Sequence, residues 1–581
     1  MLGGSNKLDY NEEFQKWLNS GKLDENDKNA LKKMSDNPSL IKESFCQNLT
    51  FGTGGLRGII GLGTNRMNKY VVRRATQGIA NYILDNDKSF KDRGVVIAYD
   101  SRHYSPEFAL ETALTMCANG IKAYLFESLR PTPELSFAIR YLKAISGIVI
   151  TASHNPAEYN GYKAYWEDGG QLPPAVSDKV LEYINAFDMF ESKTMDYEDA
   201  KKSGLLQIIG KEVDDAYIDA VYTQAINPDV VKEVADEFKL VYTPIHGSGN
   251  KPVRAILEKS GFKHVIVVKE QELPDGSFPT VKSPNPENKE CFTKAVELAR
   301  ENDVSLIIGT DPDADRMGIM LRNQKGEYIT MSGNQVGVLL ADYIISAKKE
   351  RGILPKNGAV ISTIVSTKMA KVVTESFGMK YIETLTGFKF IGEKIHEFET
   401  TKSNEFLLGF EESYGYLVGT HARDKDSVVA SMLIAEMAAY YYKKGETLYD
   451  VMQKLYKKHG GFAEKTVSIT MEGSEGIAKI KQIMEDLRAN RPQSFGNFKV
   501  NAIRDYKAGI RYDINGNSEE KLTLPNSDVL YFELSDGASF VARPSGTEPK
   551  IKMYYLIQSD TEENAKAILE KVINDVSEYF N

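Results

Sequence analysis

The sequence predicts an α/β protein with three similar α/β mixed-sheet domains and a smaller C-terminal α+β domain, arranged around a central cleft. The first observation is that short β-branched runs alternate with amphipathic stretches from about residue 51 onward. The second is that these runs form three blocks, each of which ends in a polar loop. The third is a change after about residue 461 to alternating runs typical of antiparallel strands, closed by an amphipathic helix.

These changes of pattern divide the 581 residues into four expected domains, in line with roughly 150 residues per domain. A charged segment with a helical pattern occupies about the first 50 residues and leads into the first domain. We find no low-complexity linker in the sequence, so we expect the domains to pack closely. The expected domains are residues 1–208, 209–328, 329–460 and 461–581.

Seven short runs rich in β-branched residues are the expected strands of the first three domains. Amphipathic stretches between them, such as residues 70–86 and 334–350, are the expected helices. Ligands in such sheets bind beyond the carboxyl ends of the strands, so we expect functional groups in the polar loops that follow the runs. The runs are residues 94–100, 146–151, 238–243, 263–268, 304–310, 358–363 and 404–410.

Composition limits the classes of function. The net charge of −9 argues against nucleic-acid binding, which usually needs a basic face, although a local group of Lys and Arg could hold a small anion. No apolar run reaches about 18 residues, so we expect no membrane span, and the N-terminus lacks the layout of a secretion signal. The three scattered cysteines form neither a disulfide framework nor a CxxC metal site, which favours the cytoplasm.

Three alternating carboxylates, Asp311, Asp313 and Asp315, follow one of the expected strands. They could form an acidic turn that caps a helix, but three in this register would repel one another unless a hard divalent cation lay between them. An EF-hand would need Gly and Glu where Arg316 and Arg322 stand, and a haloacid-dehalogenase phosphatase motif would not continue with a third Asp and an Arg. The pattern favours Mg²⁺ with a phosphate oxygen in its shell, and Arg316 could hold that phosphate from the other side.

Two further stretches have the composition of phosphate-binding loops. Residues 51–68 contain six glycines around Arg57, so their backbone could approach a phosphate, although neither a Walker A nor a dinucleotide pattern is present. Residues 542–555 offer cations, hydroxyl groups and turn amides, which suit a dianionic phosphate. An ordinary surface turn is the alternative for both. The second stretch contains Arg543, Ser545, Gly546, Thr547 and Lys550.

Ser153 stands just beyond another expected strand, in the stretch VITASHNPAEYNGYK of residues 149–163. No glycine lies two residues before or after it, so this is not the nucleophile elbow of a hydrolase. The adjacent His154 is too close along the chain to act as an ordinary triad base. Its neighbours in the sequence therefore leave the role of this serine open.

Taken together, these residues resemble the α-D-phosphohexomutase family from about residue 50 onward, and most closely its bacterial α-phosphoglucomutase branch. Four motifs in the family's order are far more specific than any one of them. The motifs are T-A-S-H-N-P at 151–156, D-P-D-A-D-R at 311–316, E-x-S at 411–413 and R-P-S-G-T-E-P at 543–549.

The resemblance implies four domains that contribute, in order, a phosphoserine loop, a metal loop, a sugar-binding loop and a phosphate-binding loop. It implies that Ser153 carries a phosphoryl group and binds Mg²⁺ together with the three aspartates. Lys163 and His154 would handle protons, and Arg57 would steady the transferring group. The implied substrate-binding residues are Arg316, Thr386, Gly387, Glu411, Ser413, Lys425, Arg543, Ser545, Gly546 and Thr547.

The implied activity is the interconversion of α-D-glucose 1-phosphate and glucose 6-phosphate, with glucose 1,6-bisphosphate as intermediate and activator. The expected partners are small sugar phosphates, and the expected state is a monomer or homodimer. A phosphopentomutase, a phosphomannomutase, a metal-dependent sugar phosphatase and a non-catalytic sugar-phosphate sensor are the alternatives. Two departures bear on sugar preference: Phe388 follows Gly387 where the phosphomannomutase/phosphoglucomutase branch has His, and residues 410–413 read F-E-E-S instead of G-E-x-S.

Overall fold

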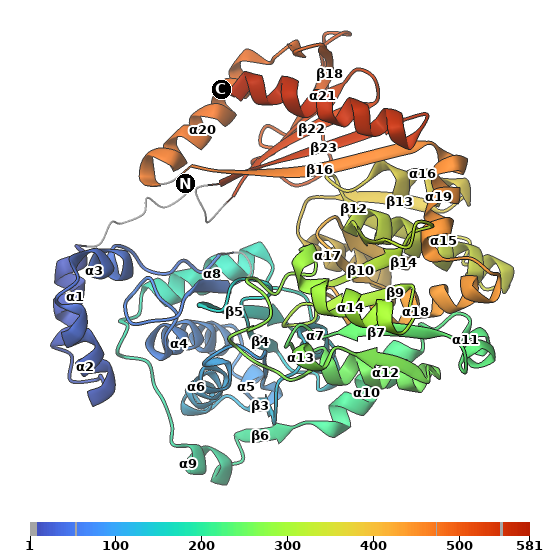
Figure 1. The fold of residues 1–581 in the computed structure, drawn as a ribbon. Helices are drawn as coiled ribbons and strands as arrows, with labels where there is room; N and C mark the ends of the chain where they lie inside the picture. The colour runs from blue at the N-terminus through green and yellow to red at the C-terminus, as the bar shows by residue number, and fades with distance from the viewer. Residues whose placement is uncertain (1–8, 53–54, 472, 546–549, 581) are drawn as a thin grey trace. The chain divides into compact units, whose positions relative to one another are not determined.

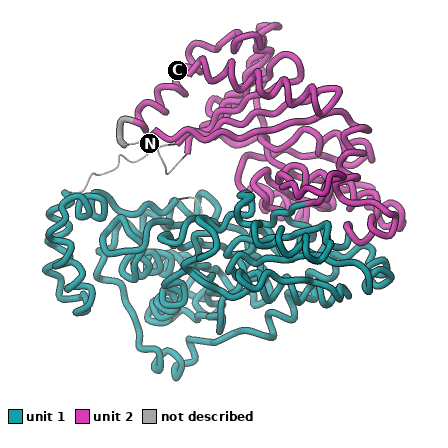
Figure 2. The backbone as a smooth tube through the Cα atoms, in the orientation of Figure 1, with its two compact units in different colours: residues 1–320, 416–436 teal, residues 321–415, 437–581 magenta. Residues whose placement is uncertain are grey.

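The computed structural model describes residues 9–52, 55–471, 473–545 and 550–580, and the chain separates into two units. Unit 1 comprises residues 1–320 and 416–436, and unit 2 comprises residues 321–415 and 437–581, as Figure 2 shows. The chain forms three α/β domains with mixed sheets and a C-terminal domain rich in β-structure (Figure 1). The fold class predicted from the sequence is therefore confirmed.

Three helices at the start of unit 1 share their core with the first α/β domain. Trp17 packs edge to face against Phe45 and Tyr70, with ring centroids 5.6 and 5.4 Å apart. These side chains belong to one buried cluster with the helices and strands that follow. The three helices are α1 (Tyr10–Leu18), α2 (Glu25–Met34) and α3 (Pro38–Phe45).

The first sheet is built from six strands, which are β1 (Gly55–Ile59), β2 (Val95–Tyr99), β3 (Ala123–Phe126), β4 (Ser146–Ile150), β5 (Tyr159–Trp166) and β6 (Leu206–Ile209). Their order is β1-β5-β4-β2-β3-β6. β2 is parallel to β3 and β4, and β3 is parallel to β6, whereas β5 is antiparallel to β4 and β1. Every residue of β4 is buried, which is why an uninterrupted apolar run forms this central strand.

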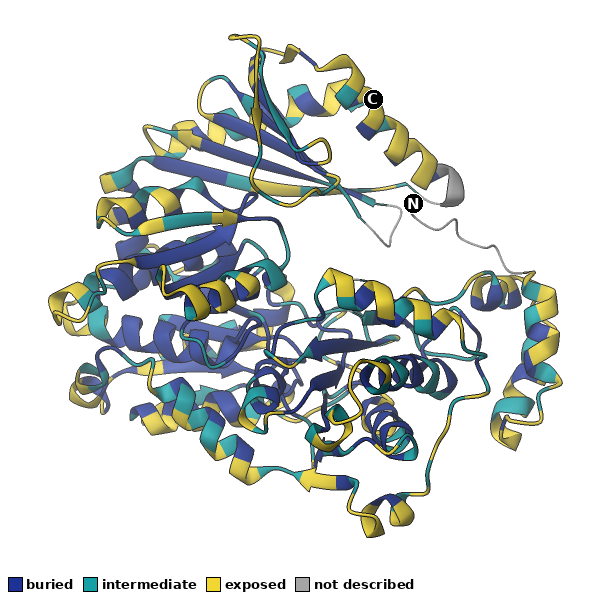
Figure 3. Cartoon of the chain, turned by 180° about the vertical axis from the view of Figure 1, so that it is seen from behind, coloured by how far each residue is buried: buried dark blue, intermediate teal, exposed yellow. Residues whose placement is uncertain are grey.

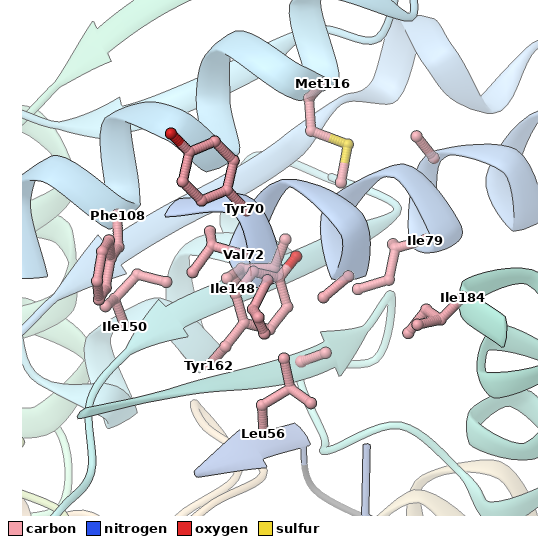
Figure 4. Close-up of a cluster of buried hydrophobic side chains, with 14 of the residues drawn as sticks. Leu56, Tyr70, Val72, Ile79, Phe108, Met116, Ile148, Ile150, Tyr162 and Ile184 are labelled. Atoms are coloured by element: carbon pink, nitrogen blue, oxygen red, sulfur yellow. The ribbon is translucent and has the colours of Figure 1, made fainter. Parts of the chain in front are cut away.

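Six helices accompany this sheet: α4 (Lys69–Asn86), α5 (Phe90–Arg93), α6 (Ser105–Ala118), α7 (Thr132–Tyr141), α8 (Pro174–Asn185) and α9 (Tyr197–Lys202). Figure 4 shows Val72 and Ile79 of α4 above Ile148 of β4 and Tyr162 of β5. Burying one such aliphatic side chain stabilises the fold by about 1.5–3 kcal/mol. The cluster therefore fixes β4 and β5 firmly, and with them the loop that joins the two strands.

The second sheet contains five strands, β7 (Lys239–Thr243), β8 (His264–Val267), β9 (Leu306–Thr310), β10 (Met317–Arg322) and β11 (Tyr328–Met331), in the order β11-β10-β9-β7-β8. β7 is parallel to both β8 and β9, and β9 is buried along its whole length. The elements around them are α10 (Lys211–Tyr222), α11 (Pro228–Val234), α12 (Asn250–Ser260), α13 (Lys269–Glu272), the 3-10 helix η1 (Lys289–Phe292) and α14 (Thr293–Glu301).

Unit 2 begins with a third α/β domain in which β12 is parallel to both β13 and β14. Its strands β12 (Gly358–Thr363), β13 (Lys380–Thr384) and β14 (Glu405–Glu411) lie in the order β13-β12-β14. Its helices are α15 (Gly333–Glu350), α16 (Lys368–Ser376), α17 (Phe388–Thr401) and α19 (Leu448–His459). The short strand β15 (Gly415–Leu417) and the helix α18 (Ser427–Lys443) each continue from one unit into the other.

The C-terminal part of unit 2 is an antiparallel sheet with two helices, α20 (Gly473–Asn490) and α21 (Glu562–Phe580). The long strands β16 and β23 pair over ten residues each, and their order in the sheet is β16-β23-β22-β21-β18-β19-β20, with β17 paired to β18. The strands are β16 (Gly461–Thr470), β17 (Ser494–Phe495), β18 (Phe498–Asp505), β19 (Ile510–Asp513), β20 (Ser518–Lys521), β21 (Leu530–Leu534), β22 (Ala538–Pro544) and β23 (Lys550–Ser559).

Burial follows the same plan in every domain. Figure 3 shows buried residues along the strands, with exposed residues gathered on the outer sides of the helices. Among the described residues, no helix combines the length and the apolar character needed to cross a membrane.

Candidate functional site

Ser153 lies in the loop that follows β4, where parallel strands of the first sheet end. Its side chain is buried, and its backbone N–H donates a 2.8 Å hydrogen bond to Thr151 Oγ1. The φ of Ser153 is +52°, a left-handed conformation that is uncommon for a residue other than glycine. The buried strand and this local turn therefore place the serine hydroxyl in one defined position.

Asp311, Asp313 and Asp315 follow β9, and all three are at most 1% exposed. One oxygen atom of each lies within 4.8 Å of the others. The backbone N–H groups of Asp315 and Arg316 both donate to Asp311 Oδ1, at 3.1 and 3.0 Å, which folds the loop back on itself. The alternating carboxylates thus converge, as their spacing predicts.

The serine loop and the aspartate loop meet inside unit 1. Ser153 Oγ donates a 2.8 Å hydrogen bond to Asp311 Oδ2. Lys163, on β5, places Nζ 2.6 Å from Asp313 Oδ2 and 3.2 Å from Asp315 Oδ2. We name this group of Ser153, Lys163, Asp311, Asp313 and Asp315 the serine–aspartate cluster.

Lys425 adds a second buried cation to the serine–aspartate cluster. Its Nζ lies 3.2 Å from Asp315 Oδ2 and 2.9 Å from Asp424 Oδ1. Asp424 is fixed in turn by Tyr165, whose hydroxyl donates to Asp424 Oδ2 at 2.7 Å, and by Gln171 at 3.0 Å. Residues 416–436 belong to unit 1, and their Lys425 supplies a second positive charge beside the aspartates.

The carboxylates differ in their acidity. Burial, together with Asp313 and Asp315, raises the pKa of Asp311 well above its usual range. Burial would also raise the pKa of Asp315, but Lys163, Lys425 and Arg316 outweigh it and hold that pKa below its usual value. Ionising all three carboxylates of the serine–aspartate cluster therefore costs free energy, and a bound cation would remove that cost.

The donor set fits a hard divalent cation. Three buried carboxylates supply oxygen ligands only, which suits Mg²⁺. Asp313 Oδ1 is buried and has no hydrogen-bond partner among the described residues, so a lone pair is available for a metal ion. These residues could hold Mg²⁺ beside the Ser153 hydroxyl.

His154 lies beside the serine, and the charges of two arginines act on its ring. His154 Nδ1 lies 3.3 Å from Ser153 Oγ. Burial, with the charges of Arg316 and Arg57, lowers the pKa of His154 well below its usual value, so the ring is neutral near pH 7. Arg57 Nη1 donates to Asn155 Oδ1 at 3.1 Å, and Arg316 Nη1 pairs with Glu287 Oε1 at 3.0 Å.

Arg57 differs from the sequence prediction in its local structure. The glycine-rich stretch suggests a loop, but Arg57 lies on the edge strand β1, opposite Gly161 of β5. The side chain is exposed, whereas Leu56 and Gly58 on either side of it are buried. The glycines let β1 lie close to β5, because a Cβ atom on Gly55 would come within 1.8 Å of a backbone oxygen of Tyr162.

The residues expected to contact the sugar belong to unit 2. Glu411 ends β14 and is buried, and its Oε1 accepts a 2.9 Å hydrogen bond from the Gly387 N–H. Gly387 has a φ of +123° and stands between the half-buried Thr386 and the start of α17. Ser413 follows Glu411 in the same loop. The structure thus brings the expected residues 386, 387 and 411 together at the ends of β13 and β14.

The expected phosphate-binding loop follows β22. Arg543 lies on this strand, opposite Lys552 of β23, and the Ser545 N–H donates to the Lys550 carbonyl at 2.7 Å. Gly546 and Thr547 lie outside the described residues.

Sequence reasoning missed Thr132 and Asp424. Thr132 begins α7 and donates to Asp313 twice, from its N–H to the Asp313 carbonyl at 2.9 Å and from its hydroxyl to Oδ2 at 2.8 Å. Asp424 anchors Lys425, as described above. The sequence P-T-P before a helix and the alternation D-K-D are signals too common to single these residues out.

Three family models match the chain one after another. They describe the phosphoglucomutase/phosphomannomutase alpha/beta/alpha domains I, II and III, and they match residues 48–190, 215–326 and 332–459. The phosphoglucomutase of Staphylococcus haemolyticus is 36% identical over 551 residues, which is 94% of this chain and 96% of that protein. A phosphoglucomutase of Staphylococcus epidermidis is 38% identical over 521 residues, or 89% and 92% of the two chains.

Solved structures share the fold. The exocytosis-sensitive phosphoprotein pp63/parafusin, a phosphoglucomutase from Paramecium, has a TM-score of 0.68 at 19% identity and covers 92% of this chain and 95% of its own. A phosphoglucomutase/phosphomannomutase family protein from Burkholderia thailandensis has a TM-score of 0.63 at 18% identity, with 91% and 96% covered.

Proposed function

This chain belongs to the phosphoglucomutase/phosphomannomutase family of α-D-phosphohexomutases, and we propose that it interconverts α-D-glucose 1-phosphate and glucose 6-phosphate. The observation that carries the proposal is the 2.8 Å contact of Ser153 Oγ with Asp311, inside a buried group of three carboxylates and two lysines. A serine in this setting can carry a phosphoryl group, because cations balance the added negative charge of roughly −1.5 to −2.

The proposed cofactor is Mg²⁺, held by Asp311, Asp313 and Asp315 together with an oxygen on Ser153. When bound, this ion supplies charge neutralisation for the phosphoryl group in transfer. Arg57 and Arg316 supply further positive charge beside Ser153, and both contribute to the lowered pKa of the neighbouring His154. Phosphoryl transfer depends mainly on such positioning and neutralisation.

In the proposed reaction, phospho-Ser153 donates to the 6-hydroxyl of glucose 1-phosphate. The Oγ–P bond breaks and a bond forms between phosphorus and the sugar O6, while the sugar hydroxyl proton passes to a base and the leaving Ser153 Oγ takes up a proton. The product, glucose 1,6-bisphosphate, turns over in the site. In the second transfer the O1–P bond breaks and the Oγ–P bond forms again, the Ser153 hydroxyl proton passes to a base, O1 takes up a proton, and glucose 6-phosphate leaves.

We assign the two proton-handling side chains different tasks. Burial opposes the charge of Lys163, but Asp313 and Asp315 outweigh it and raise its pKa, so the ammonium group keeps its proton and can donate it. His154 is neutral near pH 7 and lies beside Ser153 Oγ, so it can accept a proton.

The remaining roles belong to groups that hold the substrate. We assign sugar hydroxyls to Glu411 and Ser413, with Thr386 and Gly387 in the adjacent turn, and we place Lys425 on a substrate oxygen. The phosphate that is not reacting is assigned to the loop with Arg543, Ser545, Gly546 and Thr547. Free Cys46, Cys117 and Cys291 suit a reducing compartment, so we place the protein in the cytoplasm.

The test is a coupled assay of glucose 1-phosphate conversion with Mg²⁺ and a trace of glucose 1,6-bisphosphate. Ser153→Ala is expected to lower kcat by about 10³-fold or more, because the nucleophile is lost. Ser146→Ala removes another buried hydroxyl, which donates to the Tyr165 carbonyl, and should keep near-normal turnover. Unchanged turnover in Ser153→Ala would overturn the mechanism, and steady release of inorganic phosphate by the unmodified protein would indicate a phosphatase.

Sugar preference is tested in the same assay with mannose, glucosamine, ribose and deoxyribose 1-phosphates. We expect glucose 1-phosphate to be preferred. A clear preference for a pentose phosphate would instead assign the protein to the phosphopentomutase activity, with Phe388 and the F-E-E-S loop as the first residues to exchange.

A further inference from the structure

Arg102 lies beneath the loop that carries Ser153. Its side chain is among the largest in the described chain to be fully buried, with 1% of the residue exposed. A buried guanidinium group is costly unless hydrogen bonds and an opposite charge compensate it. The hydrogen-bond and ion-pair partners of Arg102 therefore show which part of the structure its buried charge stabilises.

Four of those partners are backbone carbonyls, three in the loop that follows β4 and one on Tyr159, the first residue of β5. Arg102 Nη2 donates to the carbonyls of Ser153, at 2.5 Å, and Asn155. Nη1 donates to the carbonyls of Pro156, at 2.8 Å, and Tyr159, at 3.0 Å. Residues 151–158, between β4 and β5, form no regular secondary structure, so Arg102 takes the place of a strand partner for this segment.

Arg102 is itself held from two further sides. Its Nε lies 3.3 Å from Asp100 Oδ2, and Asp100 Oδ1 accepts hydrogen bonds from the Arg102 N–H and from Ser105 Oγ. The ring of Phe278 covers the guanidinium, with its centroid 5.1 Å from Cζ. The guanidinium is therefore a fixed point, to which the loop is attached.

The attachment has a direct effect on Ser153. A residue with a Cβ atom disfavours a φ of +52°, so surrounding contacts must maintain this conformation. The carbonyl of Ser153 is bound by Arg102, and a planar trans peptide then turns the His154 N–H away from Arg102. One side chain thus fixes both the strained serine and the orientation of the next peptide.

We infer that Arg102 is a positioning residue for phosphoryl transfer, because it holds the Ser153 backbone in the conformation that presents Oγ to Asp311. The inference rests on the proposed function of Ser153, but it concerns a residue with no place in the reaction itself. A lysine could keep the charge at this position. It could not reproduce the planar fork that reaches four carbonyls.

The experiment compares Arg102→Lys with Arg74→Lys. Arg74 is a matched control, because its Nε also donates to two backbone carbonyls, those of Ile184 in the last turn of α8 and of Phe187 just beyond it, both at 3.0 Å. We measure the rate at which glucose 1,6-bisphosphate phosphorylates Ser153 in a single turnover, detected by mass spectrometry, and the steady-state kcat and KM. Thermal unfolding of each variant reports its stability.

We expect Arg102→Lys to lower both the phosphorylation rate and kcat by about 10²-fold with KM within about threefold of the unmodified protein, since misplacing a reacting group by about 1 Å has such an effect. Arg74→Lys should lose comparable thermal stability and keep its phosphorylation rate. A folded Arg102→Lys variant that phosphorylates Ser153 at the normal rate would overturn the inference, as would an equal loss of rate in Arg74→Lys.

A second variant serves if Arg102→Lys does not fold. Asp100→Asn keeps the shape of the side chain but removes the negative charge that pairs with Arg102 Nε. We expect kcat to fall about tenfold with little change in KM. A normal kcat would overturn the inference. If the unmodified protein has no mutase activity, the proposed function fails first, so the two failures are distinguishable.

Discussion

The buried carboxylates around Ser153 show how one residue can serve function at the expense of stability. Asp311 accepts a hydrogen bond from Ser153 and two from backbone N–H groups, yet its pKa is raised because burial and two neighbouring aspartates disfavour its charge. Such sites gain activity and lose stability. The cost falls on the metal-free protein, since a bound cation would relieve it.

We therefore predict that Asp311→Asn stabilises the metal-free protein. The sign follows from the pKa: a carboxyl whose pKa is raised on folding contributes stability below its unfolded pKa and loses it as pH rises. At pH 7.5 in EDTA, the variant should gain about 1 kcal/mol in the free energy of urea unfolding. Mg²⁺ should raise the Tm of the unmodified protein and leave that of the variant unchanged. A less stable variant in EDTA would contradict the prediction.

Much of this local chemistry could be predicted from the sequence. The alternation of Asp311, Asp313 and Asp315 predicts that their carboxylates converge, because a tight loop after a buried strand allows its side chains few orientations. Thr132 could not be found in this way, since it reaches Asp313 across 181 residues of chain. A contact of this kind depends on how two sheets pack, which local patterns do not determine.

At the scale of elements, β5 is the strand on which the site depends. It lies between β4 and β1, so its register determines the position of Lys163 and which residue lies opposite Arg57. Gly161, opposite Arg57, accepts a hydrogen bond from the Thr151 N–H at 3.1 Å. A Cβ atom on Gly161 would lie 2.5 Å from the Thr151 carbonyl oxygen and 2.8 Å from that of Leu56.

Gly161→Ala should therefore disturb the site from within the sheet. Both clashes are with backbone atoms, which cannot rotate away as a side chain would, so we expect a loss of about 2 kcal/mol or more in unfolding free energy. Activity should fall as well, because Thr151 leads directly into Ser153. Gly21→Ala is the control, since nothing lies within 4 Å of a Cβ atom there. Equal stability of the two variants would refute this account.

The strands were the most predictable elements. Residues 146–151 and 304–310 match β4 and β9 closely, because an uninterrupted apolar run in an α/β protein has few alternatives to a central strand. The edge strand β1 was wrongly expected to be a loop, since its glycines hide the alternation that normally identifies a strand. Its identity depends on its partner β5, which local sequence does not reveal.

At the scale of the molecule, unit 2 joins its two domains through a shared core. Ile364 and Leu385 of the third α/β domain pack in one buried cluster with Tyr531 and Val541 of the C-terminal sheet. Glu464 of β16 lies at the same junction, where the side chains of Thr367 and Asn334 act to lower the pKa of its carboxyl. Burial outweighs them and raises the pKa of Glu464 to about 7.

We predict that the Glu464 carboxyl makes the free energy of unfolding of unit 2 depend on pH. Its raised pKa means that its contribution to stability is present below about pH 4.5 and is lost as pH rises through about 7. Glu464→Gln cannot ionise, so it should match the unmodified protein near pH 4 and exceed it by about 2 kcal/mol at pH 8 in urea unfolding. Glu485→Gln, at an exposed position of α20, should show no such gain. A difference that is the same at both pH values would contradict the assignment.

The return of residues 416–436 to unit 1 has a consequence for synthesis on the ribosome. Asp315 and Lys163 emerge early, whereas Lys425, which also contacts Asp315, emerges only after most of the third domain has been made. Domains generally fold as they appear, so the nascent unit 1 holds three buried carboxylates with one of their two lysines missing. Free Mg²⁺ in the cell would then help the chain to fold before any substrate arrives.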